Sequence, residues 1–229
     1  MKKNILLVCL SIFALLSCSS KDEAVYSCDP NVNNWVKSNI KQIQSMKRSE
    51  WLDLEKSKQL AAGIAFTPEE KHKFWLEKLN EVLTLKWSGD EKKHISELYN
   101  WIYQNPDIFK NSNKESVEYV NFEKYMYQWS EEGKAKFGWN KQILSAIAMD
   151  GNKMIDITGN MEKRIKLKSN TRLKVPTEIG LGKTCSCYTM HNYCDNDADC
   201  VDHSTSKCNT TNMGCGWLTW EKCDGYCKS

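Results

Sequence analysis

Apolar side chains recur every three or four residues along most of the stretch from Asp29 to about Met149, which is the spacing of one face of an α-helix. The pair Asp29-Pro30 is typical of a helix start, because aspartate caps free backbone N–H groups and proline is tolerated at the first helical position. Thr67 and Glu70 have the spacing of a capping box and predict a further start. No alternation of apolar and polar residues has a comparable length. The pattern therefore predicts a mainly α fold.

Residues 29–150 are expected to form a helical bundle whose aromatic and aliphatic stripes make up its core. His72 and His94 lie among Lys and Glu residues and are expected on polar faces, without metal-ligand spacing. No phosphate-binding loop, zinc-protease helix or nucleophile elbow occurs, so we predict no enzyme activity, no catalytic residue, no cofactor and no metal site. Six helices are expected. The first starts after Asp29, the second spans about 49–65 and the third starts after Thr67. The fourth runs from Ser88 to Asn105, the fifth includes Phe122–Trp129 and the sixth spans 140–149.

The N-terminus has the pattern of an export signal. A basic start precedes apolar residues 5–16, which are fewer than the ~18 residues that a membrane-spanning helix needs. The four residues that end at Cys18 resemble a bacterial lipobox, in which the cysteine receives a diacylglycerol. We therefore predict a lipoprotein signal peptide at 1–17, lipidation of Cys18 and a tether at 18–28. An ordinary secretory leader or a short anchor is the alternative.

Export sets the expected surroundings of the mature chain. An acylated chain would be attached to a membrane through its lipid, at the cell surface or released from it by later cleavage. Oxidising surroundings would also permit disulfides. The formal net charge is only +3, from 32 Lys and Arg against 29 Asp and Glu, which gives no reason to expect a nucleic acid partner.

Residues 151–183 are interpreted as a basic connector. A short hairpin about Gly159-Asn160 is expected at its start. The stretch from Lys163 to Lys174 holds six basic residues and no acidic one. It is interpreted as a solvated charge run, with contact to anionic lipid headgroups or a proteolytic site as alternatives.

Residues 184–229 form the most distinctive segment, because eight cysteines are concentrated there. A segment of this size cannot bury enough apolar surface to fold alone, and in an exported chain such cysteine density predicts a four-disulfide, loop- and β-rich module. Few contacts with the helices are expected, and Cys28 is expected to lie outside the bridges. A zinc cluster is the competing interpretation, but paired Cys-x-x-Cys spacing is missing. The cysteines are Cys185, Cys187, Cys194, Cys200, Cys208, Cys215, Cys223 and Cys227.

Two further patterns lie inside this segment. Asp195, Asp197 and Asp199 alternate as at the start of a calcium loop, but the glycine and the final glutamate of such a loop are missing, so a solvated acidic turn is preferred. The stretch Trp217-Leu218-Thr219-Trp220 is apolar and flanked by glycines. We predict that Trp217, Leu218 and Trp220 contact a target or a membrane, with packing against the disulfides as the alternative.

The cysteine-rich segment resembles the fulvocin C-related bacteriocin family of Bacteroidetes. In that family a leader precedes a helical region and a cysteine-rich tail, so the resemblance covers nearly the whole mature chain. It implies an antibacterial tail that acts on an unknown receptor or membrane of target bacteria. The matching segments are Cys185-Ser186-Cys187, Tyr193-Cys194, Gly214-Cys215-Gly216-Trp217, Cys223-Asp224-Gly225 and the helical stretches 28–37 and 65–71.

The sequence thus predicts an exported, bacteriocin-like lipoprotein whose helical domain presents the tail or acts as a pro-region. The alternative is a surface-anchored binding module, because residues 193–200 resemble part of the whey-acidic-protein type of protease inhibitor. That family has an adjacent pair of cysteines, which this chain lacks.

Overall fold

The computed structural model describes residues 24–27, 29–110, 115–162, 199–202, 214–219, 221 and 225–228. These parts of the chain are mainly helical, which confirms the prediction of a mainly α fold. They hold seven α-helices, two short 3-10 helices and one two-stranded antiparallel sheet. The elements are α1 Pro30–Ile43, α2 Arg48–Leu52, α3 Lys56–Ala65, α4 Pro68–Val82, α5 Gly89–Gln104, η1 Pro106–Phe109, α6 Val117–Phe137, α7 Lys141–Ala148, β1 Asp199–Asp202, η2 Trp217–Thr219 and β2 Gly225–Lys228.

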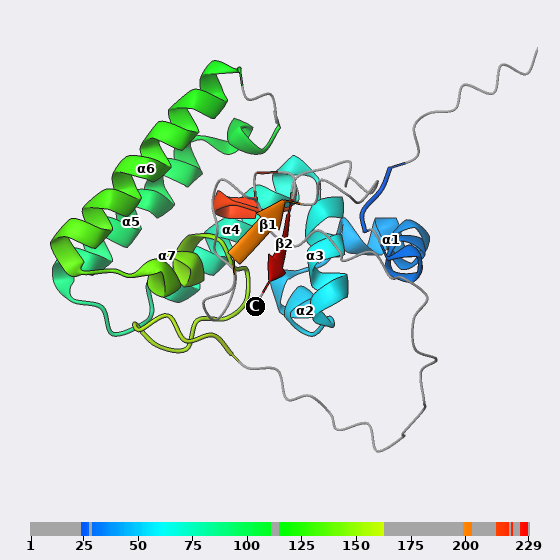
Figure 1. The fold of residues 1–229 in the computed structure, drawn as a ribbon, viewed down its shortest axis with the longest axis horizontal. Helices are drawn as coiled ribbons and strands as arrows, with labels where there is room; N and C mark the ends of the chain where they lie inside the picture. Colours follow the sequence, from blue (N-terminus) through cyan, green and yellow to red (C-terminus); the bar gives the residue numbers. More distant parts are fainter. Residues whose placement is uncertain are drawn as a thin grey trace, which may run out of the picture.

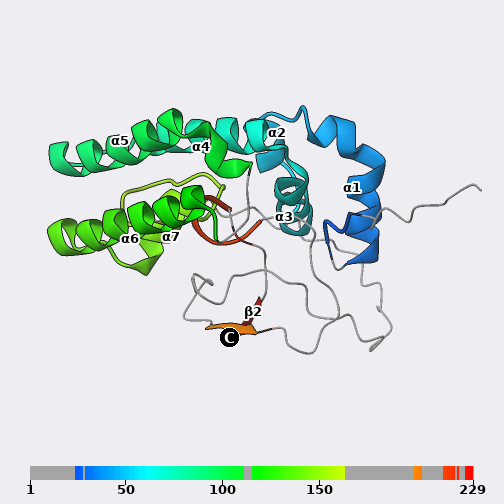
Figure 2. The same ribbon diagram turned by 90° about the horizontal axis from the view of Figure 1, so that it is seen from above.

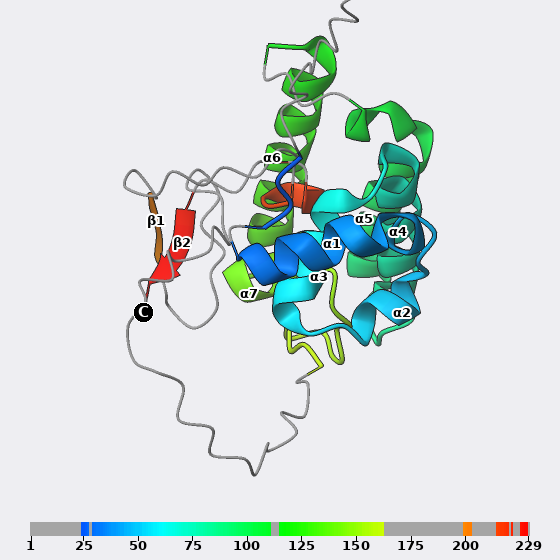
Figure 3. The same ribbon diagram turned by 90° about the vertical axis from the view of Figure 1, so that its right-hand side faces the viewer.

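Four helices make two layers (Figures 1 and 2). α4 and α5 pack along each other in one layer, and they contact α7 and α6 of the second layer. α3 packs on α1 and α2 at one end of the layers. The sheet of β1 and β2 lies to one side of the helices (Figure 3). The core between the layers includes Trp75 and Leu79 of α4, Ile95 and Leu98 of α5, and Met126 of α6.

The predicted helix starts are confirmed where a polar cap announces them. The Asp29 carboxylate accepts hydrogen bonds from the backbone of Asn31 and Val32 at the start of α1. Thr67 and Ser88 each form a capping box with the glutamate three residues on. Each cap satisfies backbone N–H groups that have no partner inside the helix, so the start of a helix is encoded locally.

The predicted helix 49–65 is wrong as one element, because the chain breaks between α2 and α3. Trp51 and Gln59 explain the break. The Trp51 indole N–H donates to the backbone carbonyl of Gln59 at 2.8 Å, and the side-chain amide of Gln59 donates to the backbone carbonyl of Trp51 at 3.2 Å. Residues eight apart in a continuous helix are about 12 Å apart along the axis, so these mutual contacts require a bend.

The packed body extends past residue 150, where the connector was predicted to begin. The Gly151 carbonyl accepts two hydrogen bonds from the Arg48 guanidinium, and Met154 is buried. Met154 pairs with Met161 in an antiparallel bridge, and the turn between them uses the positive φ of Gly159. The short hairpin about Gly159 is therefore confirmed, but it packs on the helices and is not part of a free connector. The basic stretch from 163 lies outside the described residues.

Within the described ranges, no helix is both long and apolar enough to cross a bilayer.

Candidate functional site

A turn of the C-terminal segment lies inside the helical body. In Figures 2 and 3 the segment around η2 runs between the helices of the two layers. Trp217 is 3% exposed and Leu218 is fully buried, and both belong to the same hydrophobic core as the helices. Burial of one large apolar side chain is typically worth about 1.5–3 kcal/mol. We call residues 214–219 together with Glu221 the tail turn.

Side chains of α4 and α6 hold the tail turn. The Trp129 ring of α6 meets the Trp217 ring edge to face, with centroids 6.4 Å apart. The Trp75 indole N–H donates to the Thr219 hydroxyl at 3.2 Å. The Tyr119 hydroxyl donates to the buried carboxylate of Glu221. Apolar contact and polar partners therefore both fix the turn against the helices.

The backbone of the tail turn is closed and strained. The Glu221 carbonyl accepts from the N–H of Gly214 and of Cys215, both at 2.8 Å, and the Glu221 N–H donates back to Cys215 at 2.7 Å. Leu218 and Thr219 have φ of 51° and 54°, in the left-handed region that non-glycine residues rarely occupy. Such a conformation costs of order 1–3 kcal/mol per residue and persists only where the surroundings impose it.

The prediction that Trp217 and Leu218 contact a target or membrane is wrong for this structure, because both face the helical core. Trp220 lies outside the described residues. The prediction of few contacts between tail and helices is also wrong for the tail turn. The segment is too small to bury its own apolar surface, and the helices provide the apolar partner that it lacks.

The predicted disulfide scaffold stays a prediction for most of its cysteines. Cys215 is buried and disulfide-bonded. Cys200 of β1 and Cys227 of β2 are opposite each other in the antiparallel register. The other five tail cysteines, Cys18 and Cys28, and Asp195 and Asp197 of the calcium-like pattern lie outside the described residues. In the ranges that the structure describes, no group of three or more His, Cys, Asp or Glu residues is arranged to hold a metal.

A buried charged cluster was missed by sequence reasoning. The Arg48 guanidinium forms a two-pronged contact with the Glu81 carboxylate, at 2.8 and 3.3 Å. Lys78 is fully buried, and its ammonium donates to the Asn152 carbonyl. Burial lowers the pKa of Lys78 to about 7 and that of Lys71 to about 8.

A lysine with so low a pKa can act as a base or nucleophile where substrate reaches it. Lys78 has no exposed surface, so we assign it a structural role. The helical spacing of the sequence indicates that both lysines lie on the apolar face of α4. Lys71 and Lys78 share the helical stripe of Trp75 and Leu79. The prediction that His94 lies on a polar face is also wrong. His94 is 5% exposed and stacks on Trp129 with ring centroids 5.3 Å apart.

His72 is half-buried, and its Nε2 lies 3.1 Å from the Ile102 carbonyl, so this histidine too makes a contact within the helical body.

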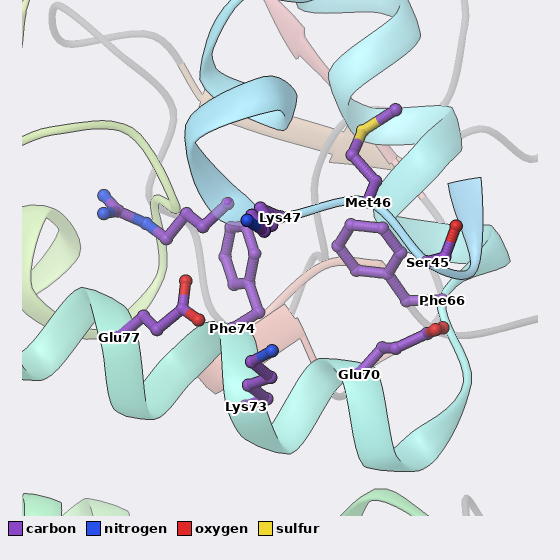
Figure 4. A pocket seen from close by; sticks show the side chains of 9 residues that line it. Ser45, Met46, Lys47, Phe66, Glu70, Lys73, Phe74 and Glu77 are labelled. Carbon is purple, nitrogen blue, oxygen red and sulfur yellow. The ribbon is translucent and has the colours of Figure 1, made fainter. Parts of the chain in front are cut away.

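A small pocket of about 110 Å³ lies between residues 45–48 and α4 (Figure 4). The Phe66 and Phe74 rings and the side chain of Lys73 line it, and the Glu70 carboxylate at its edge already caps Thr67. Sites for drug-sized ligands are typically about 300–1,000 Å³, so this pocket is too small for one.

Comparisons with protein-family models, with curated proteins and with solved structures find no match for the chain. Among the structural features described above, the burial of the tail turn bears most directly on function. The tail turn joins the segment with the distinctive cysteines to the helical body.

Gly214 offers a direct test of how the tail turn is seated. A Cβ at this position would lie 2.4 Å from Cγ1 of the buried Ile64 in α3. We expect Gly214→Ala to lower the free energy of unfolding by about 1–3 kcal/mol, which is the usual cost of overpacking. Urea denaturation monitored by tryptophan fluorescence measures this change.

Gly63→Ala is the matched control, because Gly63 precedes Ile64 in α3 and a Cβ there meets no atom within 4 Å. That change should stabilise the helix by about 0.5–1 kcal/mol. A Gly214→Ala chain as stable as wild type would show that the tail turn does not pack on α3 in solution.

Proposed function

We propose that the chain is an exported, bacteriocin-like lipoprotein whose helical domain holds an antibacterial cysteine-rich tail in a docked state. Cys18 would carry the lipid, and four disulfides would stabilise the tail. The lipobox-like sequence and the resemblance of the cysteine pattern support export and antibacterial activity. The burial of Trp217 and Leu218 in the helical core is the observation that supports docking.

Docking would keep the tail inactive until it is released. Trp217 and Leu218 form the large apolar part of the tail turn, and a buried surface cannot bind a membrane or a receptor. The left-handed backbone of Leu218 and Thr219 also favours release, because the strain is relieved when the helices no longer impose it. This gives the helical domain the role of a pro-region and distinguishes it from a passive stalk.

The test uses the whole chain with a specific protease site inserted between Gly182 and Lys183. Cut and uncut protein are compared in growth-inhibition assays on a panel of Bacteroidetes strains. We expect inhibition after cutting and little before it, because the intact tether favours redocking. Reduction of the disulfides before the assay should abolish the inhibition.

A second variant weakens docking without altering the tail. Tyr119→Phe removes the donor to the Glu221 carboxylate while keeping the ring. The cut protein should then inhibit growth at lower concentration. Tyr127→Phe on the exposed face of α6 is the control and should change nothing.

Equal inhibition by uncut and cut chains would contradict release and favour presentation of the tail by the intact lipoprotein. Inhibition of serine proteases without any effect on growth would favour the alternative, a surface-anchored protease inhibitor.

A further inference from the structure

A second surface feature lies between α5 and α6. It is a groove of about 380 Å³, which falls within the usual size of a ligand site. Trp101 of α5 and Tyr125 of α6 form part of its wall, stacked at 4.4 Å with their planes only 7° apart. Both side chains are half-buried, so part of each ring contributes surface to the groove, while the two stacked faces cover each other.

Two carboxylates stand beside these rings. Glu97 of α5 and Glu132 of α6 line the groove, and about half of each side chain is exposed. Burial, followed by the negative charges of Glu97 and Glu132, raises the pKa of the Tyr125 hydroxyl, which places both carboxylates near the phenol. Glu132 also pairs with Lys136 at 2.7 Å, and Glu97 lies 3.5 Å from Nδ1 of His94.

The lining residues include neither lysine nor arginine. Aromatic rings attract cations through the negative charge of their faces, and nearby carboxylates add to this attraction. An anion would be repelled by the two glutamates. A neutral ligand could contact the rings but would gain nothing from the two carboxylate charges.

We infer that the groove between α5 and α6 binds a basic peptide, with a guanidinium or ammonium group placed beside the stacked pair of Trp101 and Tyr125 and between Glu97 and Glu132. Exposed amide side chains of Asn100, Gln104 and Gln128 line the same groove and can donate to the carbonyls of such a peptide. The inference does not depend on the proposed function, because the rings and carboxylates that would hold the cation play no part in docking of the tail. Trp129 is shared, because it lines the groove and also contacts Trp217.

Isothermal titration of the chain without residues 1–18 tests the inference with hexa-arginine as the probe. Saturable binding with one peptide per chain is expected. Hexaglutamate and maltohexaose serve as the anionic and neutral probes and should not bind. Trp101→Phe should weaken the binding of hexa-arginine, because phenylalanine offers a cation a weaker face than tryptophan.

Glutamate variants decide whether the groove is the binding site. Glu97→Gln with Glu132→Gln should weaken hexa-arginine binding by about tenfold or more, since both charges near the cation are lost. Glu131→Gln is the matched control, because Glu131 precedes Glu132 in α6, pairs with Lys134 at the same 2.7 Å, is similarly exposed and does not line the groove. This control should leave the affinity unchanged. All three substitutions alter exposed side chains, and circular dichroism confirms that the fold is intact.

Three results would overturn the inference. They are no saturable binding of hexa-arginine at millimolar concentration, equal losses of affinity from Glu131→Gln and from the double variant, and preferential binding of maltohexaose. The last result would assign the groove to a neutral saccharide.

Discussion

Trp217→Ala in the full chain should lower the free energy of unfolding by about 3–5 kcal/mol, the usual loss when a buried aromatic side chain is truncated. Trp217 is 3% exposed and packs edge-on against Trp129 in the core of the helices. Guanidinium denaturation, followed by circular dichroism of the helices, measures the change. Hydrogen exchange should also show faster exchange at the amides of Gly214 and Cys215, which are bonded to Glu221 in the closed turn.

Tyr127→Ala is the control for this prediction, because Tyr127 lies on α6 with 66% of its surface exposed. Its removal should change stability by no more than about 0.5 kcal/mol. If Trp217→Ala costs as little as Tyr127→Ala, the tail turn does not contribute to the core. The tail would then be the independent module that the cysteine pattern predicted.

The features that the sequence predicted well are those encoded by neighbouring residues. Asp29, Thr67 and Ser88 announce helix starts because their side chains bond to backbone N–H groups two or three positions on. The glycine at 159 similarly predicts a turn through its own backbone freedom. Such signals need no knowledge of the rest of the chain.

The features that sequence reasoning missed depend on contacts between distant segments. The break between α2 and α3 follows from the hydrogen bonds that join Trp51 and Gln59 in space. The docking of Trp217 needs a partner, Trp129, that is almost ninety residues away in the chain. Composition showed that a small tail could not bury its own tryptophans, but it could not indicate that another part of the chain would cover one of them.

The buried lysines fall between these two cases. The helical periodicity places Lys71 and Lys78 on the apolar stripe of α4, so their position was predictable. The burial of Lys78 depends on the segment after α7, where the backbone carbonyl of Asn152 accepts from the Lys78 ammonium. A lysine at a stripe edge commonly extends its charge to water, which makes burial a poor expectation from sequence alone.

Burial of Lys78 makes the stability of the chain depend on pH. The pKa of Lys78 is about 7 in the folded chain against 10.5 for the ordinary side chain, chiefly because burial disfavours the charged form. The unfolded chain therefore binds more protons between these two values, and stability rises with pH across that window. Below about pH 7 the destabilisation that results from burying a charged Lys78 is present in full, and above about pH 10.5 it is absent. Lys71, at about 8, adds a smaller rise in the upper part of the same window.

The free energy of unfolding should rise by about 3 kcal/mol between pH 7 and pH 9.5 from Lys78 alone, at about 1.36 kcal/mol per pH unit. Urea denaturation at fixed ionic strength measures the rise. In Lys78→Met the rise should shrink by that amount, because the group no longer titrates. The Asn152 carbonyl loses its donor at every pH, so this loss shifts the whole curve without changing its slope. Lys73→Met, on the exposed face of the same helix, should keep the wild-type slope. If both variants keep the wild-type slope, Lys78 retains its charge in the folded chain across this pH range. The backbone carbonyl of Asn152 and the nearby carboxylate of Asp150 would then offset the cost of burying the ammonium.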